Sequence, residues 1–140
     1  MAVFNGSAKI RVLEATELRP TKFSTRLGGS MRTKTLDPYV KIAVDENLIA
    51  QTASKTKTSE PSWDEDFYVV ITSGQELLFT VFNHCSLSPD EFVANSRLKL
   101  DQLYQQENSD IWVNLEPTGK LHIMIELDGS IAEDPNQDQG

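Results

Sequence analysis

The sequence contains few of the residues that carry catalysis or bind transition metals. Its 140 residues include one cysteine and two histidines. A hydrolase needs a nucleophile with a base within hydrogen-bond reach, and a zinc site needs about four ligands. His84 and Cys85 are neighbours in an expected loop, where adjacent side chains diverge, and His122 points outward from an expected strand. The sequence therefore predicts that this chain is not an enzyme and holds no cofactor.

Long apolar runs are also missing. No stretch approaches the ~20 residues that span a bilayer. The opening MAVFNGSAKI has neither the basic region nor the apolar core of a signal peptide. Cys85 has no partner for an internal disulfide, which fits a reducing compartment such as the cytosol. We expect a cytoplasmic protein that stays outside the secretory route.

Basic residues are scarce outside one window. The formal net charge is −8 at pH 7, and this argues against a nucleic-acid partner because phosphate backbones attract basic surfaces. Residues 19–59 carry eight basic residues and three acids, a balance of +5 that leaves the remainder at −13. Five of the eight lie in RPTKFSTRLGGSMRTKT, which has no acid. This segment predicts contact with an anionic partner, and the alternative is a solvated loop without a role.

Most of the chain alternates between apolar and polar residues with a period of two, as Ile10 and Val12 do in SAKIRVLEA. Such alternation is typical of strands. Strand patterns occupy residues 7–15, 39–44, 48–55, 64–71, 76–83, 92–100, 111–116 and 121–127. Only LDQLYQQEN has helical composition. We therefore expect an all-β, eight-stranded antiparallel β-sandwich with one short helical connector, and we expect Trp63, Phe67 and Trp112 in its core.

Two segments depart from this pattern. Residues 19–38, called the basic loop below, form a connection much longer than the ~4 to 6 residues that usually join elements, and long loops of this kind are often functional. Residues 128–140 contain four acids, no base and little apolar content, so they predict an acidic disordered tail or linker. We accordingly expect a domain over residues 1–127 that belongs to a longer protein.

The middle of the chain resembles the C2 domain family in two linked stretches, LDPYVKIAV and QTASKTKTSEPSWDEDFYVVI. The first has the Asp-Pro-Tyr-Val strand entry of the family, and the second has a Lys-rich strand followed by Pro-x-Trp-x-Glu-x-Phe. The pattern continues in LLFTVFN, FVANSRLKLDQL, WVNLE and GKLHIMIEL. With the opening MAVFNGSAKIRVLEATELRPT and the basic loop, the chain resembles the amino-terminal C2 domain of a novel protein kinase C of the epsilon and eta group, in an epsilon-like invertebrate form.

This resemblance implies a regulatory domain of a diacylglycerol-dependent, calcium-independent serine/threonine kinase. In the family a pseudosubstrate, two zinc-binding diacylglycerol-binding C1 domains and a kinase domain that uses ATP and magnesium follow the C2 domain. The implied function is targeting of the kinase from the cytoplasm to membranes that contain phosphatidic acid and phosphatidylserine, with a contribution to autoinhibition through contacts with other kinase domains. The alternative is a protein-interaction module that docks the kinase to anchoring proteins.

The loop VFNHCSLSPDEFV raises the question of a metal ion. Calcium prefers six to eight oxygen ligands, and the resemblance implies about five aspartates gathered from two loops in members that bind it. Asp37 and Glu91 fall at two of these positions, whereas Asn83 and Cys85 replace two others. The remaining position lies in the basic loop. We therefore expect no metal here, and an alternative role for Asp37 is to organise a turn before proline.

The basic loop provides the candidates for membrane contact. An anionic membrane attracts each nearby basic residue by ~1 kcal/mol, and an aromatic residue can wedge between lipids. The resemblance implies lipid contacts by an aromatic residue and arginines of the loop, and Leu87 is expected as an apolar tip of the loop after residue 83. The candidates in the basic loop are Lys22, Phe23, Arg26, Arg32 and Lys34. The alternative is a loop that only covers the end of the sandwich.

Two further surfaces are candidates. Lys55 and Lys57 alternate along an expected strand and would share one face, extended by Lys41, as a patch for phosphoinositides; the alternative is that they only keep a strand surface soluble. The segment EATELRPT falls where the family has an anchoring-protein segment. It makes a docking candidate of Glu14, Glu17, Leu18 and Arg19. From the residues alone it is a strand end that continues into a loop.

Overall fold

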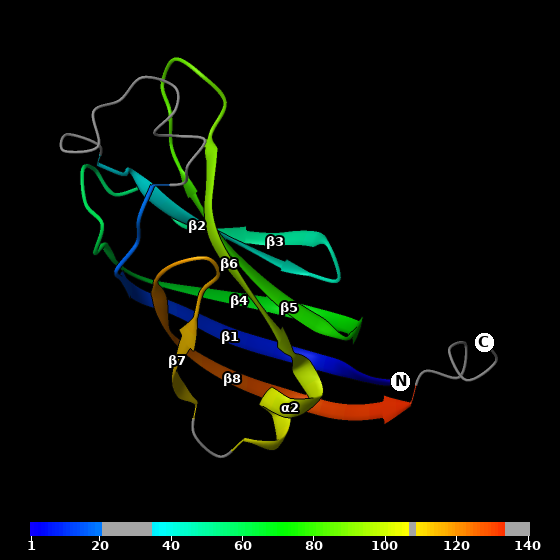
Figure 1. Ribbon diagram of the computed structural model, residues 1–140. Coiled ribbons are helices and arrows are strands. Elements are labelled where there is room, and N and C mark those ends of the chain that lie inside the picture. Colours follow the sequence, from blue (N-terminus) through cyan, green and yellow to red (C-terminus); the bar gives the residue numbers. More distant parts are fainter. Residues whose placement is uncertain (21–34, 107–108, 134–140) are drawn as a thin grey trace.

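The computed structural model describes residues 1–20, 35–106 and 109–133. Over these residues the chain forms two facing antiparallel sheets and one short helix (Figure 1), with strand orders β4-β1-β8-β7 and β3-β2-β5-β6. The elements are β1 (Ala2–Thr16), β2 (Pro38–Val44), β3 (Asn47–Gln51), β4 (Ser62–Gly74), β5 (Glu76–Asn83), β6 (Glu91–Lys99), α2 (Leu100–Gln105), β7 (Asp110–Asn114) and β8 (Lys120–Glu133). The predicted all-β sandwich with one helical connector is confirmed.

The core lies between the two sheets and follows the alternation of the sequence. Ile10 and Val12 of β1 and Val40 and Ile42 of β2 belong to it, and all four are fully buried. Each such side chain contributes about 1.5–3 kcal/mol relative to an exposed one. Trp63 is also buried, as expected, and Phe67 packs partly buried against the same cluster. In the described part of the chain, no helix is long and apolar enough to cross a bilayer.

The expected strand over residues 48–55 was wrong in its second half, because β3 ends at Gln51. Thr52 closes the strand by accepting the Val40 amide N–H through its hydroxyl at 2.9 Å and donating its own amide to the Val40 carbonyl. Beyond it the chain turns, and Lys57 adopts a left-handed φ of 53°. Lys55 and Lys57 therefore do not share a strand face.

The expected boundary at residue 127 was also wrong, since β8 continues through Glu133 and pairs with β1 as far as Ala2. Gly6 and Gly129 lie opposite each other in this pairing, and a Cβ on Gly129 would stand 2.1 Å from the Asn5 carbonyl oxygen. Backbone hydrogen bonds to a long neighbouring strand order residues 128–133 despite their polar composition. Residues 134–140 of the predicted tail lie outside the described residues.

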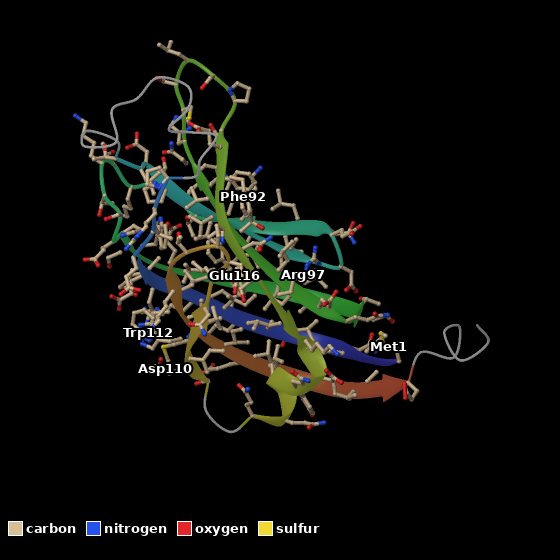
Figure 2. The ribbon with its side chains drawn as sticks, in the orientation of Figure 1. Met1, Phe92, Arg97, Asp110, Trp112 and Glu116 are labelled. Carbon is tan, nitrogen blue, oxygen red and sulfur yellow. The ribbon has the colours of Figure 1, made fainter. Side chains whose placement is uncertain are left out.

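Trp112 is not in the core, contrary to expectation, and its exposed fraction is 49%. In β7 the partly buried Ile111 and the buried Val113 face inward, so the intervening tryptophan must point out. Figure 2 shows Trp112 and Asp110 at the outer side of β7. The indole stacks on His122 of β8, with ring centroids 4.5 Å apart and an angle of 12° between the rings.

Candidate functional site

Three segments meet at one end of the sandwich, at the upper left of Figure 1: residues 35–37, 52–61 and 84–90. Backbone hydrogen bonds connect them. The Thr58 amide donates to the Leu36 carbonyl at 2.8 Å, and the His84 amide donates to the Asp37 carbonyl at 2.9 Å. This end carries all the described positions that the sequence analysis compared with a calcium site.

Asp37 and Asn83 hold two of these segments together. The Asn83 side-chain oxygen accepts the Asp37 amide N–H at 2.7 Å, and one carboxylate oxygen of Asp37 accepts the Lys57 amide N–H at 2.8 Å. Asn83 is buried, so this hydrogen bond removes the cost of an unsatisfied amide. The Asp37 carboxylate thus organises a loop, and the partner is a residue twenty positions away.

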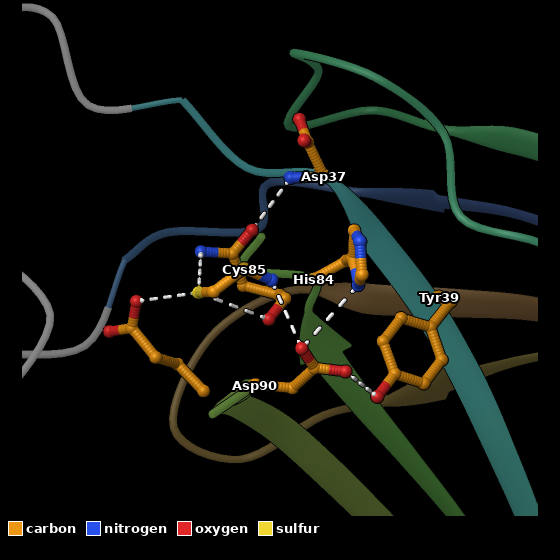
Figure 3. A network of polar contacts seen from close by, with 7 residues as sticks. Asp37, Tyr39, His84, Cys85 and Asp90 are labelled. Carbon is orange, nitrogen blue, oxygen red and sulfur yellow. Dashed lines mark hydrogen bonds and ion pairs between the residues drawn. The ribbon is translucent and has the colours of Figure 1, made fainter. Parts of the chain in front are cut away.

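Asp90 joins the loop of residues 84–90 to β2 (Figure 3). The Tyr39 hydroxyl donates to one oxygen of Asp90, and the Cys85 amide donates to the other at 3.0 Å. Burial and the hydrogen bond to this carboxylate raise the pKa of Tyr39 to about 12. The same hydrogen bond, with that from the Cys85 amide, lowers the pKa of Asp90. The phenol therefore keeps its proton and the carboxylate its charge near neutral pH.

Although the Cys85 amide bonds to Asp90, the Cys85 side chain points toward Glu91. Its sulfur lies 3.2 Å from Glu91 Oε1 and 3.8 Å from the Asn83 amide nitrogen. Burial, then the hydrogen bond to Glu91, raises the pKa of the Cys85 thiol, so the thiol stays protonated and donates to the carboxylate. Glu91 Oε2 is buried without a hydrogen-bond partner in the described structure.

These residues do not fit a calcium ion. Asn83 supplies a neutral oxygen that is already used by the Asp37 amide, and Cys85 supplies sulfur, which is a poor calcium ligand. Asp90 and Asp37 each accept a hydrogen bond from the protein. Among residues 1–20, 35–106 and 109–133 no cluster of three or more histidine, cysteine or acidic residues is suited to a metal.

The family model of the C2 domain matches residues 6–115, most of the sandwich described above. The chain belongs to the C2 domain family. C2 domains are lipid-binding modules, and this one is of the kind found in protein kinase C epsilon and eta.

This C2 domain is similar in sequence to the corresponding part of several protein kinases C. It is 42% identical over 134 residues to protein kinase C-like 1B of Caenorhabditis elegans, covering 94% of this chain and 19% of that protein. It is 38% identical to the epsilon type of Oryctolagus cuniculus, covering 99% and 19%, and 37% identical to the eta type of Homo sapiens, covering 93% and 20%. The C2 domain thus spans about a fifth of the length of these relatives.

A solved structure of the C2A and C2B domains of Extended-Synaptotagmin 2 with calcium bound has the same fold. The TM-score is 0.72 at 25% identity, with 91% of this chain and 47% of that chain covered. The match supports the sandwich topology of the C2 domain. At the loop end of this chain, Asn83 and Cys85 provide an amide and a thiol, and the Asp37 and Asp90 carboxylates accept hydrogen bonds from the protein.

The predicted lipid contacts of this C2 domain lie partly beyond the described structure. Leu87 is at the tip of the loop of residues 84–90 and is 99% exposed. Lys41 is on β2, where its ammonium lies 4.9 Å from the centroid of the Phe82 ring, and it is not on the same element as Lys55 and Lys57. The basic-loop candidates Lys22, Phe23, Arg26, Arg32 and Lys34 lie outside the described residues.

The docking candidate EATELRPT begins at the end of β1 and runs into a loop, as the sequence predicted. Glu17 and Arg19 are exposed. Leu18 is 2% exposed and packs in the core, so it is not available to a partner. Glu14 is held by His122, whose Nδ1 lies 3.0 Å from Glu14 Oε2.

Tyr39 belongs to the loop end, which the sequence alone did not predict. Tyr39 was considered only as part of the Asp-Pro-Tyr-Val motif, and Asp90 only as part of the loop VFNHCSLSPDEFV. One feature of the sequence could have indicated this position. Tyr39 follows the Asp-Pro pair at the start of β2, where the hydroxyl of a tyrosine can reach the neighbouring loops. Its pairing with Asp90 joins residues 51 positions apart, which no local pattern encodes.

Proposed function

We propose that this C2 domain is a calcium-independent module that brings a protein kinase C-type serine/threonine kinase from the cytoplasm to membranes containing phosphatidic acid or phosphatidylserine. The observation that carries the proposal is the loop end. Amide and thiol groups stand there in place of carboxylates, and the acids present are engaged by protein donors. Attraction to lipid then has to come from basic and apolar side chains and not from a bound cation.

The rest of the longer protein is part of the proposal. We infer a parent kinase with zinc-containing C1 domains and a catalytic domain that uses ATP and magnesium, in which the C2 domain also contributes to autoinhibition through contacts with the other domains. The net charge of −8 opposes adsorption to an anionic membrane. A single basic loop therefore gives weak binding, and a diacylglycerol-binding domain supplies the second attachment.

Vesicle sedimentation in EGTA tests the lipid proposal. Arg26→Ala together with Arg32→Ala should weaken binding to phosphatidic acid vesicles about thirtyfold at low salt, because each arginine contributes ~1 kcal/mol near the surface. Lys55→Ala with Lys57→Ala is the matched control of equal charge change and should cost less. If the unmodified domain binds neutral vesicles as well as anionic ones, or if the lysine double variant loses more affinity than the arginine double variant, the basic loop is not the main lipid contact.

Calorimetric titration with calcium tests the proposed calcium independence. We expect no saturable heat at micromolar calcium, because too few carboxylates converge at the loop end. A saturable signal that Asp37→Asn abolishes would overturn calcium independence while leaving lipid binding in place.

Docking to an anchoring protein is the second candidate, favoured by the exposure of Glu17 and Arg19 just beyond β1. Exposed polar loop residues of this kind often carry recognition. Glu17→Ala with Arg19→Ala should weaken such a complex without lipid present and should leave vesicle binding unchanged. A loss of vesicle binding in this pair would assign the segment to the membrane instead.

A further inference from the structure

Both ends of the loop of residues 84–90 make hydrogen bonds to the residues at the start of β2. At its start, the Asn83 side chain accepts the Asp37 amide at 2.7 Å, and the His84 amide donates to the Asp37 carbonyl at 2.9 Å. At its end, Asp90 accepts the Tyr39 hydroxyl. Figure 3 shows these side chains converging on one small region between the two segments.

A second set of contacts closes the loop on itself. The Cys85 amide donates to Asp90 at 3.0 Å, which joins the first turn of the loop to its last residue. The Cys85 thiol contacts Glu91 Oε1 at 3.2 Å at the start of β6. Between these anchors stands Leu87, 99% exposed. The loop is thus fixed at its base and apolar at its tip.

A cation shared between two loops would perform this same mechanical task, since carboxylates from both loops that bind one ion are held at a fixed distance from each other. Here the Asp37 amide donates to Asn83 and the Tyr39 hydroxyl donates to Asp90, so hydrogen bonds between protein groups join the two segments. Tyr39 is 5% exposed and its ring stacks on Phe82 at 5.8 Å between centroids, so packing restricts the side chain that carries the hydroxyl. The hydrogen bond to the charged Asp90 is of the stronger kind.

We propose that Tyr39, Asp90 and Asn83 are positioning residues that replace a metal ion as the cross-link between these loops and so hold Leu87 in place for insertion into lipid. The inference rests on the proposed lipid-binding function and adds to it the residues that prepare the contact. A loop ordered before binding loses less conformational entropy when it meets the membrane. An exposed leucine on such a loop gains burial only through a partner.

A double-mutant cycle tests the proposal on phosphatidylcholine vesicles with and without phosphatidic acid, in EGTA, at a temperature where every variant is folded. Leu87→Ala should weaken binding to the anionic vesicles about tenfold, from the apolar surface lost. Tyr39→Phe removes only the hydroxyl and should weaken binding several-fold. In the double variant, loss of the hydroxyl should cost no further affinity, because the tip that it positions is already gone.

Tyr104→Phe is the matched control, since it also removes one hydroxyl, which donates to the Gly129 carbonyl at 2.7 Å on a different part of the molecule. It should leave affinity unchanged. Hydrogen exchange provides a second readout: the Cys85 amide should exchange faster in Tyr39→Phe and not in Tyr104→Phe.

The outcomes separate the two proposals. If the unmodified domain does not bind anionic vesicles, the proposed function fails. If it binds and Tyr39→Phe binds equally well, or if the losses in Tyr39→Phe and Leu87→Ala simply add, the positioning role is overturned and the lipid proposal stands.

Discussion

Two histidines of this C2 domain lie beside acidic residues, but they differ in burial and in the number of carboxylates that they contact. His84, at the loop end, is half exposed, and its Nδ1 lies 3.4 Å from Asp90. His122, on the outer face of the sheet β4-β1-β8-β7, is 17% exposed, with Glu14 Oε2 3.0 Å from one ring nitrogen and Asp110 Oδ1 2.6 Å from the other. One histidine is peripheral to its carboxylate, and the other is clamped between two.

The difference follows from what else each acid contacts. Asp90 already accepts hydrogen bonds from the Tyr39 hydroxyl and the Cys85 amide. His84 is an additional partner, and solvent screens its interaction with Asp90 because the histidine is half exposed. His122 is shielded by the stacked Trp112 ring and is 17% exposed, whereas the side chains of Glu14 and Asp110 are 44% and 51% exposed. Burial works against its protonation, but the hydrogen bonds to Glu14 and Asp110 outweigh this and raise the pKa of His122.

The comparison separates two ways of tying segments together. The loop end relies on a phenol with a pKa of about 12 and on a carboxylate with a lowered pKa, and neither changes its charge near neutrality. The sheet relies on an imidazole with a raised pKa, which lies between Glu14 and Asp110 and joins β1, β8 and β7. We therefore expect pH to act on the sheet and to leave the loop end intact.

The largest effect should come from His122→Ala. It removes the imidazole that contacts both Glu14 and Asp110 and that stacks on Trp112. Two charge-assisted hydrogen bonds to half-exposed acids predict a loss of about 2–3 kcal/mol in the free energy of unfolding. Urea denaturation followed by fluorescence would measure it. A loss below about 0.5 kcal/mol, the range of ordinary surface changes, would remove the contrast with His84.

A smaller loss, about 1–2 kcal/mol, is expected for Asp90→Asn, which keeps the size of the side chain but loses the charge that Tyr39 and the Cys85 amide approach. Asp101→Asn on α2 is the control, because Asp101 is part of a local contact to the Gln102 amide. If the two asparagine variants lose equal stability, the tie at the loop end is no stronger than a local surface contact.

The pH dependence should be smaller still and confined to the sheet. The folded-state pKa of His122 is raised above its unfolded value of about 6.5. Its stabilisation is therefore fully present below pH 6.5 and is lost as pH rises through the folded pKa. The difference in unfolding free energy between the parent and His122→Gln, measured from pH 5.5 upward, should shrink with pH. A constant difference would mean that the clamp does not depend on protonation.

The smallest effect is expected for His84→Gln, within about 0.5 kcal/mol of the parent, since the side chain is half exposed and its contact with Asp90 is long. The same denaturation measurement decides it. A loss comparable to that of Asp90→Asn would show that the imidazole is a necessary part of the loop network.

The sequence could predict the parts of this protein that depend on local pattern. Alternation of apolar residues predicted the strands, and residues 92–100 and 121–127 were found close to where it placed them. The identities of Asn83 and Cys85 were enough to question a calcium site, because ligand chemistry belongs to the residue itself. The prediction that Trp112 lies in the core was wrong, although the alternation with Ile111 and Val113 places it on the opposite face of β7.

Tertiary structure alone decided which distant residues meet. Asp90 lies 51 positions from Tyr39, and the two meet because the loop of residues 84–90 packs against the start of β2. His122 lies 108 positions from Glu14, and the register of β1 with β8 pairs these two residues. The register of β1 with β8 likewise ordered residues 128–133, whose composition favours disorder. A strand's sequence specifies which face is apolar, whereas its neighbour and its register are set by the packing of the whole sandwich.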